Sequence, residues 1–497
     1  MKLKLQPHQA RVARLIVEAT FPFYIFWGMG SGKSIGGLAC LAALLERVDA
    51  TAASTRPHRG ARPRALVICD KSVCAQWRAE AHRFLDAAVA TRVDIVHFES
   101  LDAADTVEPV AYAAVVVDEA HRFRNAWHTG SERMLSWMAR IQRCPRVIYM
   151  SGTPLVHHAE VEYDAFCRMM QSTADTADDR LRHRVSFYDP RQDPKRSHHY
   201  AETRNEVIEC PMSWAQTFRY LQHRRQTFRL VVGDGDVRER VSSSCNAYGT
   251  LLRSISNCPF PDAPLLGPKM ARVLDELSAA EKQGARQVVY SSRRDTGVDA
   301  LLALWTARTA GAKRIFRITG SMSIQEREAQ MQRFNRALRS SVLFITDAGA
   351  QGIDCKRVDV VHILEPAESL QEERQTINRA VRYKAHAARK EALVVVKRYV
   401  SVFPTSGAVA PPWKRVLFES GLFERHEMAG ITRPVQYALK RLIRDEERYK
   451  TIDMRTLESR AERDREVQGL LERIKRCDPE YRPPPLSPDG VVELGRV

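Results

Sequence analysis

The sequence lacks any Cys-x-x-Cys pair, and its ten cysteines are scattered along 497 residues. The closest two, Cys69 and Cys74, have no second pair or histidine cluster at zinc-finger spacing. The segment Ser197–Tyr200 holds two histidines, but no third or fourth ligand lies at a useful distance along the chain. We therefore expect free thiols in a reducing compartment and no zinc site.

Long apolar runs are also missing. Apolar runs such as Ala113–Val117 and Leu393–Val396 fall far short of the roughly 20 residues that a membrane-spanning helix needs. The chain begins with Met1-Lys2-Leu3-Lys4 rather than with the apolar core of a secretory signal. We expect an intracellular protein with no membrane partner.

Acidic residues are outnumbered, because 60 Asp and Glu stand against 77 Lys and Arg, a formal net charge of +17. Such a balance favours polyanionic partners, although charge alone does not separate nucleic acid from an anionic membrane surface. With 44% hydrophobic residues, the chain is long enough for two or three packed domains.

Short apolar runs alternate with longer helical stretches over residues 22–150, and a second such series begins after residue 262. This alternation predicts an α/β fold with two parallel-sheet domains. The expected strands are Phe23–Trp27, Ala65–Cys69, Val93–His97, Ala113–Val117 and Arg146–Met150, then Gln287–Tyr290, Arg314–Ile318, Val342–Ile345, Val358–Leu364 and Ala392–Val396.

The remaining segments predict a linking region and an extension. Residues 155–262 combine helical patterns with a basic loop at 180–196 and a turn at 233–236. A long charged helix is expected over 435–476, with a solvated face favoured over one that reads DNA, and a disordered tail from Pro479. The expected domains are 1–205, a partly helical linking region 206–262, 263–405, and a helical extension with tail, 406–497.

The segment from Trp27 to Ser34 follows the first expected strand and opens a helix. Glycines there let backbone N–H groups surround phosphate oxygens, and the helix N-terminus adds its positive end. In such a loop Lys33 reaches the β- and γ-phosphates, and the Ser34 hydroxyl binds Mg²⁺. Trp27 occupies the position of the first glycine in the usual G-x-x-x-x-G-K-[ST] pattern. The predicted ATP-binding residues are Gly28, Met29, Gly30, Ser31, Gly32, Lys33 and Ser34.

Two adjacent carboxylates, Asp118 and Glu119, end the apolar strand of Val115–His121. Side chains alternate along a strand, so the two carboxylates can face different ways. We expect Asp118 to bind Mg²⁺ and Glu119 to polarise the water that attacks the γ-phosphate.

In this order the motifs resemble those of superfamily 2 helicases and translocases. Leu5–Gln9 looks like the adenine-reading Q motif, which implies that Gln9 contacts the base. Val67–Ser72, followed by Trp77, looks like motif Ia, which touches the nucleic-acid backbone in that family. Ser151–Pro154 matches motif III, which links hydrolysis to domain movement.

The resemblance continues in the second half of the chain. Val289–Ser292 resembles motif IV, and Phe334-Asn335 resembles part of the block that follows it. Ile345–Asp354 looks like motif V, which implies that Gly352 and Asp354 contact the nucleotide.

Gln375–Arg382 looks like motif VI, Q-x-x-G-R-x-x-R, with Asn378 in place of the glycine. Arg379 and Arg382, three residues apart, share one helix face and can both point at a γ-phosphate held by the first domain. The candidate catalytic residues are Lys33, Asp118, Glu119, Gln375, Arg379 and Arg382.

The extended box Asp118–Asn125 is similar to the D-E-A-H-x-x-[KR]-N of Swi/Snf-type translocases. Tyr383 and His386, after motif VI, are similar to a segment of the Swi/Snf-like ATPases of large DNA viruses, such as poxvirus nucleoside triphosphatase I, with Ala385 in place of a serine. The resemblance covers about residues 5–400. It implies two RecA-like domains with ATP and Mg²⁺ in the cleft between them, and for a viral protein a place in the virion or in the host cytoplasm or nucleus.

The resemblance favours an ATP-driven translocase on duplex DNA, coupled to a transcription complex. Two alternatives stay open: an unwinding helicase on DNA or RNA, and an ATP-hydrolysing transcription-factor subunit that acts as a scaffold. The basic segments 180–184 and 223–225, with Phe218, Tyr220 and Phe228 between and beside them, either grip phosphates or form an ordinary solvated surface.

Overall fold

The computed structural model describes residues 4–55, 62–102, 107–124, 126–156, 158–233, 236–241, 245–259, 266–309, 314–337, 340–346, 353–367, 370–381, 385–386, 392–404 and 450–482. The chain divides into two compact units. The first consists mainly of residues 1–198 and 462–494, and the second mainly of residues 199–368 and 372–461. Among the described helices, none is both long enough and apolar enough to cross a membrane.

The first unit is built on a six-stranded parallel sheet with the order β3-β2-β4-β5-β1-β6. Its strands are β1 (Phe23–Trp27), β2 (Ala65–Cys69), β3 (Val93–His97), β4 (Ala114–Val117), β5 (Val147–Ser151) and β6 (Val185–Tyr188). The first five confirm the expected strands to within one residue at each end. The sixth lies inside the segment that the sequence predicted to be a basic loop.

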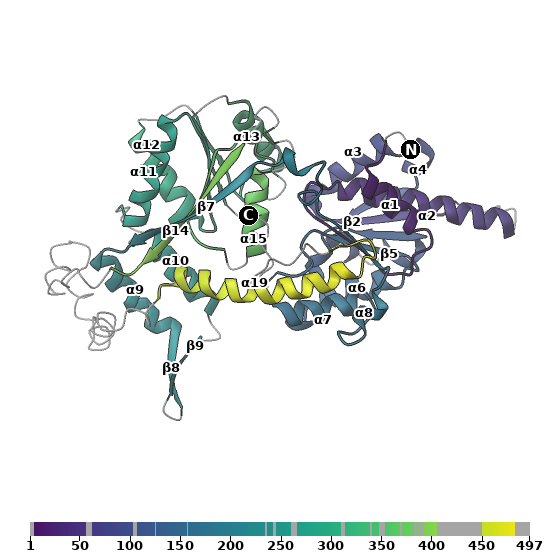
Figure 1. Ribbon diagram of the computed structural model, residues 1–497, viewed down its shortest axis with the longest axis horizontal. Coiled ribbons are helices and arrows are strands. Elements are labelled where there is room, and N and C mark those ends of the chain that lie inside the picture. Colours follow the sequence, from purple (N-terminus) through teal and green to yellow (C-terminus); the bar gives the residue numbers. More distant parts are fainter. Residues whose placement is uncertain are drawn as a thin grey trace. The chain divides into compact units, whose positions relative to one another are not determined.

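Helices cover both faces of this sheet, so its central strands are apolar on both sides (Figure 1). One face carries α1 (Pro7–Leu15), α2 (Lys33–Thr55) and α3 (Cys74–Phe84), and the other carries α6 (Glu132–Gln142) and α7 (Ala159–Met169). The shorter helices are α4 (Ala87–Ala90), α5 (Ala126–Thr129) and α8 (Ala177–Arg180).

The second unit repeats this plan with the strand order β11-β12-β10-β13-β14-β7, again fully parallel. Its strands are β7 (Glu202–Pro211), β10 (Arg286–Ser291), β11 (Ile315–Ile318), β12 (Ser341–Thr346), β13 (Val360–Ile363) and β14 (Leu393–Val402). The fold class predicted from the sequence is thus confirmed: an α/β protein with two RecA-like parallel sheets.

Helices α11 (Pro268–Lys282) and α12 (Ala300–Arg308) pack on one face of the second sheet, and α13 (Ile324–Arg336) and α15 (Leu370–Ala380) pack on the other (Figure 1). Between the two sheets the chain forms α9 (Trp214–Thr227), an antiparallel hairpin of β8 (Phe228–Gly233) and β9 (Asp236–Val241), and α10 (Cys245–Asn257). This segment overlaps the predicted linking region 206–262, and Gly233 pairs with Asp236 where the sequence predicts a turn.

The sequence did not predict strand β7, because its first five residues are all polar and it lies at the edge of its sheet. It pairs with β14 over ten residues, from Glu202 opposite Leu393 to Pro211 opposite Val402. Residues 205 and 206, on either side of the domain boundary that the sequence indicated, both lie within this strand. The second sheet therefore begins before the linking helices.

The C-terminal helix is described as α19 (Ile452–Arg476), and residues 435–449 of the predicted helix lie outside the described part of the chain. The helix has the expected solvated face, with Glu462, Arg465 and Glu466 exposed, and it also has a buried face, because Val467, Leu471 and Ile474 belong to a core cluster of the first unit. The tail was also expected to be disordered from Pro479. Within the described residues 479–482, however, Tyr481 packs edge-on against Phe187 at 5.1 Å between ring centroids.

Candidate active site

Three loops that carry predicted motifs meet because their strands are neighbours. The sheet order places β4, β5 and β1 side by side, and all run in the same direction. Their carboxyl ends therefore lie at one edge of the sheet, where ligands of parallel α/β folds bind. This edge collects the loop after β1, the carboxylates after β4 and the Ser151–Pro154 motif that begins at the end of β5.

The loop after β1 has the backbone geometry of a phosphate cradle. Gly30 and Gly32 adopt φ angles of 77° and 78°, a region that L-residues with a Cβ avoid. The loop leads directly into α2, whose 23 residues present a helix N-terminus to it. Lys33 Nζ donates to the carbonyls of Trp27 (3.0 Å) and Gly28 (3.5 Å), and the Ser31 hydroxyl is buried without a hydrogen-bond partner.

Trp27, which stands at the first glycine position of the usual loop pattern, has its own place in the core. Its ring is fully buried below the start of α2, and its Nε1 donates to Ser186 Oγ at 3.1 Å. A Cβ at Gly36 would lie 2.5 Å from this ring, so Gly36 makes the room that Trp27 occupies. The large side chain at position 27 is therefore accommodated by a glycine in the first turn of α2.

Gln9 lies against the phosphate loop and is 3% exposed. Its Nε2 donates to the carbonyls of Ser31 (3.4 Å) and Gly32 (3.2 Å), while its Oε1 accepts from the Gln6 N–H at 2.9 Å. A Cβ at Gly32 would approach Gln9 Nε2 to 2.6 Å. The predicted base-reading glutamine is thus joined directly to the loop predicted to bind phosphates.

His8 adds an aromatic contact to the same corner that the sequence did not indicate. Its Nε2 donates to the Ser31 carbonyl at 2.9 Å, and its ring stacks on Tyr188 at 3.6 Å between centroids. Burial lowers the pKa of His8 to about 4, so the ring is neutral at physiological pH. Tyr188 ends β6, the strand that the sequence did not predict.

Asp118 is buried beside the loop and is held by a residue far away in the sequence. Trp77 Nε1, on α3, donates to Asp118 Oδ2 at 3.0 Å, and the Glu119 N–H donates to Asp118 Oδ1 at 3.0 Å. The Trp77 indole is 1% exposed. Sequence comparison with motif Ia singled out Trp77 without indicating this contact, because 41 residues separate the two side chains.

Burial, together with the charge of Glu119, raises the pKa of the Asp118 carboxyl from 3.8 to about 6, although Trp77 and Lys33 oppose the shift. A carboxyl must lose its proton before it can bind a cation. We therefore expect Mg²⁺-dependent ATP binding to weaken about tenfold per pH unit below pH 6 and to be nearly constant above it. Titrations at pH 5, 6, 7 and 8, corrected for protonation of ATP without protein, measure this. An equal affinity at pH 5 and 7 would contradict it.

Glu119 has a backbone conformation that the sequence argument did not foresee. Strand β4 ends at Val117, and Glu119 adopts φ 50° and ψ 43°, the left-handed region. The two carboxylates therefore diverge through a turn rather than through the alternation of a strand. A left-handed non-glycine residue costs about 1–2 kcal/mol, and such strain is concentrated at functional sites.

His121 connects Glu119 to the motif that follows β5. Its Nδ1 lies 3.1 Å from Glu119 Oε2 and 3.1 Å from Ser151 Oγ. The Ser151 hydroxyl in turn accepts from the Thr153 N–H at 3.1 Å. A displacement of the Ser151–Thr153 loop would thus change the position of His121 and, through it, that of the Glu119 carboxylate.

The oxygen atoms present suit Mg²⁺. Asp118 offers a carboxylate and Ser34, at the start of α2, offers a hydroxyl, both of them hard ligands. Within the described residues no group of three or more His, Cys, Asp or Glu is placed to hold a metal. Mg²⁺ held by one or two protein oxygens and completed by phosphates and water needs no such group.

The predicted residues of the second unit gather around α15. Asn335 of α13 donates from Nδ2 to the Asp354 carbonyl at 2.8 Å, and the Cys355 N–H donates to the Arg379 carbonyl at 3.1 Å. Gln375 and Arg379 lie one turn apart on α15. The bond between Cys355 and Arg379 therefore joins motif V to motif VI. Gly352 and Arg382 lie outside the described residues.

Two members of the predicted basic and aromatic clusters are structural. Arg184 is 7% exposed and donates from Nε and Nη2 to the carbonyls of Pro22 and Met170. Tyr220 is 1% exposed, and its hydroxyl accepts from the Ile452 N–H at 2.6 Å. Neither side chain is therefore exposed for nucleic acid to contact.

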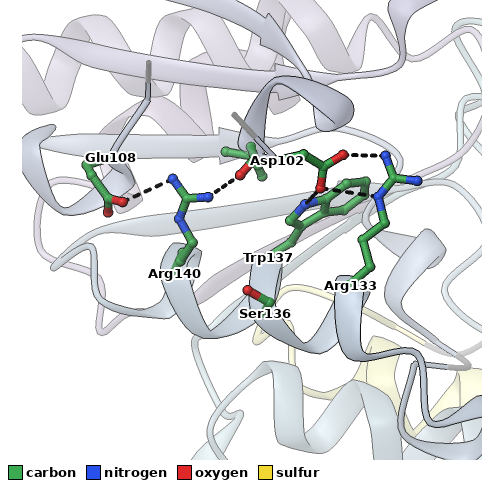
Figure 2. A pocket seen from close by; sticks show the side chains of 7 residues that line it. Asp102, Glu108, Arg133, Ser136, Trp137 and Arg140 are labelled. Carbon is green, nitrogen blue, oxygen red and sulfur yellow. Dashed lines mark hydrogen bonds and ion pairs between the residues drawn. The ribbon is translucent and has the colours of Figure 1, made fainter. Parts of the chain in front are cut away.

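A separate cavity of about 360 Å³ lies in the first unit. Figure 2 shows its arginines turned toward carboxylates: Arg133 pairs with Asp102, and Arg140 pairs with Glu108. It is lined by Leu101, Asp102, Glu108, Arg133, Ser136, Trp137 and Arg140. None of these is a predicted site residue, and the charges on the wall are already balanced within it.

Comparison with known proteins finds helicase relatives for part of the chain. Residues 268–384, from the first turn of α11 to just beyond α15, match the helicase conserved C-terminal domain family. A candidate ATP-dependent RNA helicase of Acanthamoeba polyphaga mimivirus is 29% identical over 119 residues, which cover 24% of this chain and 26% of that protein. The chain thus spans about a quarter of the length of the curated relative that it matches.

Two solved structures align over most of the chain at low identity. A Sulfolobus solfataricus SWI2/SNF2 ATPase core in complex with dsDNA is 14% identical, covers 82% of this chain and 89% of its own, and has a TM-score of 0.33. The Pyrococcus furiosus Hef helicase domain is 13% identical, covers 84% and 98%, and has a TM-score of 0.46. The family match and the mimivirus relative thus relate part of this chain to helicases, and the two structures add only a distant likeness in fold.

Proposed function

We propose that this chain is a superfamily 2 ATPase that binds ATP at the carboxyl edge of its first sheet and uses hydrolysis to move along duplex DNA. The observation that carries the ATPase assignment is the meeting of three loops on neighbouring strands. The phosphate loop after β1, the two carboxylates after β4 and the Ser151–Pro154 motif that begins on β5 lie at one edge. Helix α2 adds its N-terminus to the same place.

The proposal gives a role to each of the following side chains of the first unit. Gln9 reads the base, and Lys33 turns from the loop carbonyls to the phosphates, where its charge offsets theirs. Ser34 and Asp118 hold Mg²⁺, which neutralises phosphate charge when bound. Glu119 accepts the proton of the attacking water, with His121 and Ser151 fixing its position.

The second unit supplies the motif VI residues Gln375, Arg379 and Arg382. Guanidinium groups suit the charge that develops on a transferred phosphoryl group, because their planar fork meets two oxygens at once. We propose that Asp354, with Gly352 in the same motif, contacts the nucleotide while the phosphoryl group is transferred. The Cys355 N–H, hydrogen-bonded to the Arg379 carbonyl, couples motif V to the arginine helix.

The DNA assignment rests on charge and on the Swi/Snf-type box. The net charge of +17 favours a polyanion, and the segment Asp118–Asn125 favours translocation on a duplex over strand separation. The curated relative is named for RNA, so RNA is kept as the alternative nucleic acid. A transcription complex remains the proposed partner, and a scaffold subunit that hydrolyses ATP remains the alternative from another class.

ATPase rates measured without nucleic acid and with single-stranded DNA, duplex DNA and RNA test the function. We expect duplex DNA to stimulate hydrolysis most. At subsaturating DNA the stimulation should fall with salt, since log affinity for a duplex falls with log salt by about 0.9 for each phosphate contacted. A rate that no nucleic acid changes at low salt would refute a nucleic-acid-dependent ATPase.

A second assay separates movement from unwinding. A translocase on duplex DNA displaces a third strand bound in the major groove and leaves the duplex paired, whereas a helicase releases one strand of the duplex. We expect displacement of the third strand only, and only with ATP. Release of a duplex strand would favour the helicase, and ATP hydrolysis without either product would favour the scaffold.

A further inference from the structure

The motif VI helix carries a buried carboxylate that the mechanism above does not use. Glu373 of α15 is 1% exposed. Arg398 Nε of β14 donates to Glu373 Oε1 at 2.5 Å, and Arg460 Nη1 of α19 donates to Glu373 Oε2 at 2.5 Å. Burial raises the pKa of this carboxyl, but the two guanidinium charges outweigh burial and leave it lowered. Glu373 is therefore an ionised group held from two sides.

Both arginines are almost as buried as the carboxylate they contact. Arg398 is 7% and Arg460 is 6% exposed. Arg398 also donates from Nη1 to Asn205 Oδ1 at 2.9 Å, which ties it to β7. A desolvated pair with fixed hydrogen bonds is geometrically selective, because any displacement leaves a buried charge without its partner. Arg460 thus fixes one oxygen of Glu373 from the C-terminal helix.

The start of α19 is itself firmly part of the second unit. Asp453 is 1% exposed and accepts from Lys269 Nζ at 2.7 Å and from the Ser401 N–H at 3.0 Å. Lys269 Nζ also donates to Asn257 Oδ1 and to the Leu364 carbonyl. The part of α19 that bears Arg460 is therefore anchored two turns before it reaches Glu373.

The anchored face of α15 is opposite the face that carries motif VI. Glu373, Ile377 and Ala380 are spaced at i, i+4 and i+7, and the latter two lie in the core cluster of the second sheet. At 100° per residue, Gln375 and Arg379 fall on the other side of the helix. A rotation or axial shift of α15 about its buried face would therefore move both of them.

We propose that Arg460 of the C-terminal helix is a positioning residue for ATP hydrolysis, which acts by holding Glu373 and so fixing the motif VI helix. The proposal rests on the proposed function, since it concerns the same ATPase. It gives residues 450–461 of the extension, which match no helicase motif, a defined role in the second unit. Arg460 itself touches neither the nucleotide nor the reacting atoms in this assignment.

Arg460→Met is the informative variant, because Glu373 keeps Arg398 as its partner and no buried charge is left alone. We expect the single-turnover rate of hydrolysis per bound ATP to fall at least tenfold, while nucleotide affinity stays within twofold of wild type. A merely structural role would lower the amount of ATP bound per chain and leave the rate of the bound fraction unchanged. The two readouts are measured on the same full-length samples.

Arg473→Gln is the matched control, since Arg473 lies on the same helix and pairs with Asp178 rather than with α15. Its rate should equal that of wild type. Should Arg460→Met not fold, Arg460→Gln replaces it, because a glutamine is polar but carries no positive charge to pair with Glu373. A rate per bound ATP within twofold of wild type, for whichever variant folds, would overturn the inference. Absence of hydrolysis by wild type would instead refute the proposed function, and this inference with it.

Discussion

Glu119→Gln is expected to stop turnover while ATP stays bound. Glutamine keeps the size of the side chain and can still accept from a water, but it cannot take up the proton that the attacking water must lose. General-base catalysis contributes roughly 10²–10⁴-fold, and we expect a loss of that order in the chemical step. The left-handed backbone of Glu119 and its neighbour His121, at 3.1 Å, single it out for this role over Asp118, which faces Trp77.

Lys33→Ala should abolish turnover in a different way. The ammonium group is the cation of the phosphate loop, so its loss removes charge that stabilises bound ATP as well as the transition state. We expect ATP affinity to fall with Lys33→Ala and to persist with Glu119→Gln. Equilibrium binding of a fluorescent ATP analogue, measured beside single-turnover hydrolysis, separates the two variants. If Glu119→Gln hydrolyses ATP at the wild-type rate, the assignment of Glu119 as the base is wrong.

Arg379→Ala is expected to leave a folded protein that binds ATP but scarcely hydrolyses it. Gln9, Lys33 and Ser34, three of the residues proposed to bind ATP, belong to the first unit and are untouched by this change. Arginines that complete a phosphoryl-transfer site contribute about 10³–10⁵ in rate, or roughly 4–7 kcal/mol of transition-state stabilisation. Arg382→Ala, in the same motif, should behave alike.

The lysine variant and a control on the same helix sharpen this prediction. Arg379→Lys should recover little, because a point charge does not reproduce the fork that meets two phosphate oxygens. Arg374 also lies on α15 but does not share the face of Gln375 and Arg379, so Arg374→Ala should retain most of the activity. Single-turnover rates with circular dichroism as a folding check decide it. If Arg379→Ala stays within threefold of wild type in the chemical step, the motif VI assignment must be withdrawn.

The local elements of this protein follow from its sequence. Strands β1 to β5 begin and end within a residue of where the alternation of apolar runs and helices places them, since both faces of a parallel strand are buried and such strands stand out. The predicted phosphate loop and the two carboxylates could be located in the sequence for a similar reason. Each is a short strand followed by a turn, so all the residues that define it are neighbours in the chain.

The tertiary structure alone decided which of these elements meet. Strand order set β5 between β4 and β1, and this brought the carboxylates to the phosphate loop across more than 80 residues of chain. Packing paired Trp77 with Asp118, and Trp27 with Gly36, in contacts that no periodicity encodes. The C-terminal helix shows most clearly what the sequence does not reveal. Its mixed charges indicate a solvated surface, but Asp453 and Arg460 are buried. Lys269 neutralises Asp453, and Glu373 neutralises Arg460. A charged side chain can be buried only beside an oppositely charged partner, and only the folded chain brings the two together.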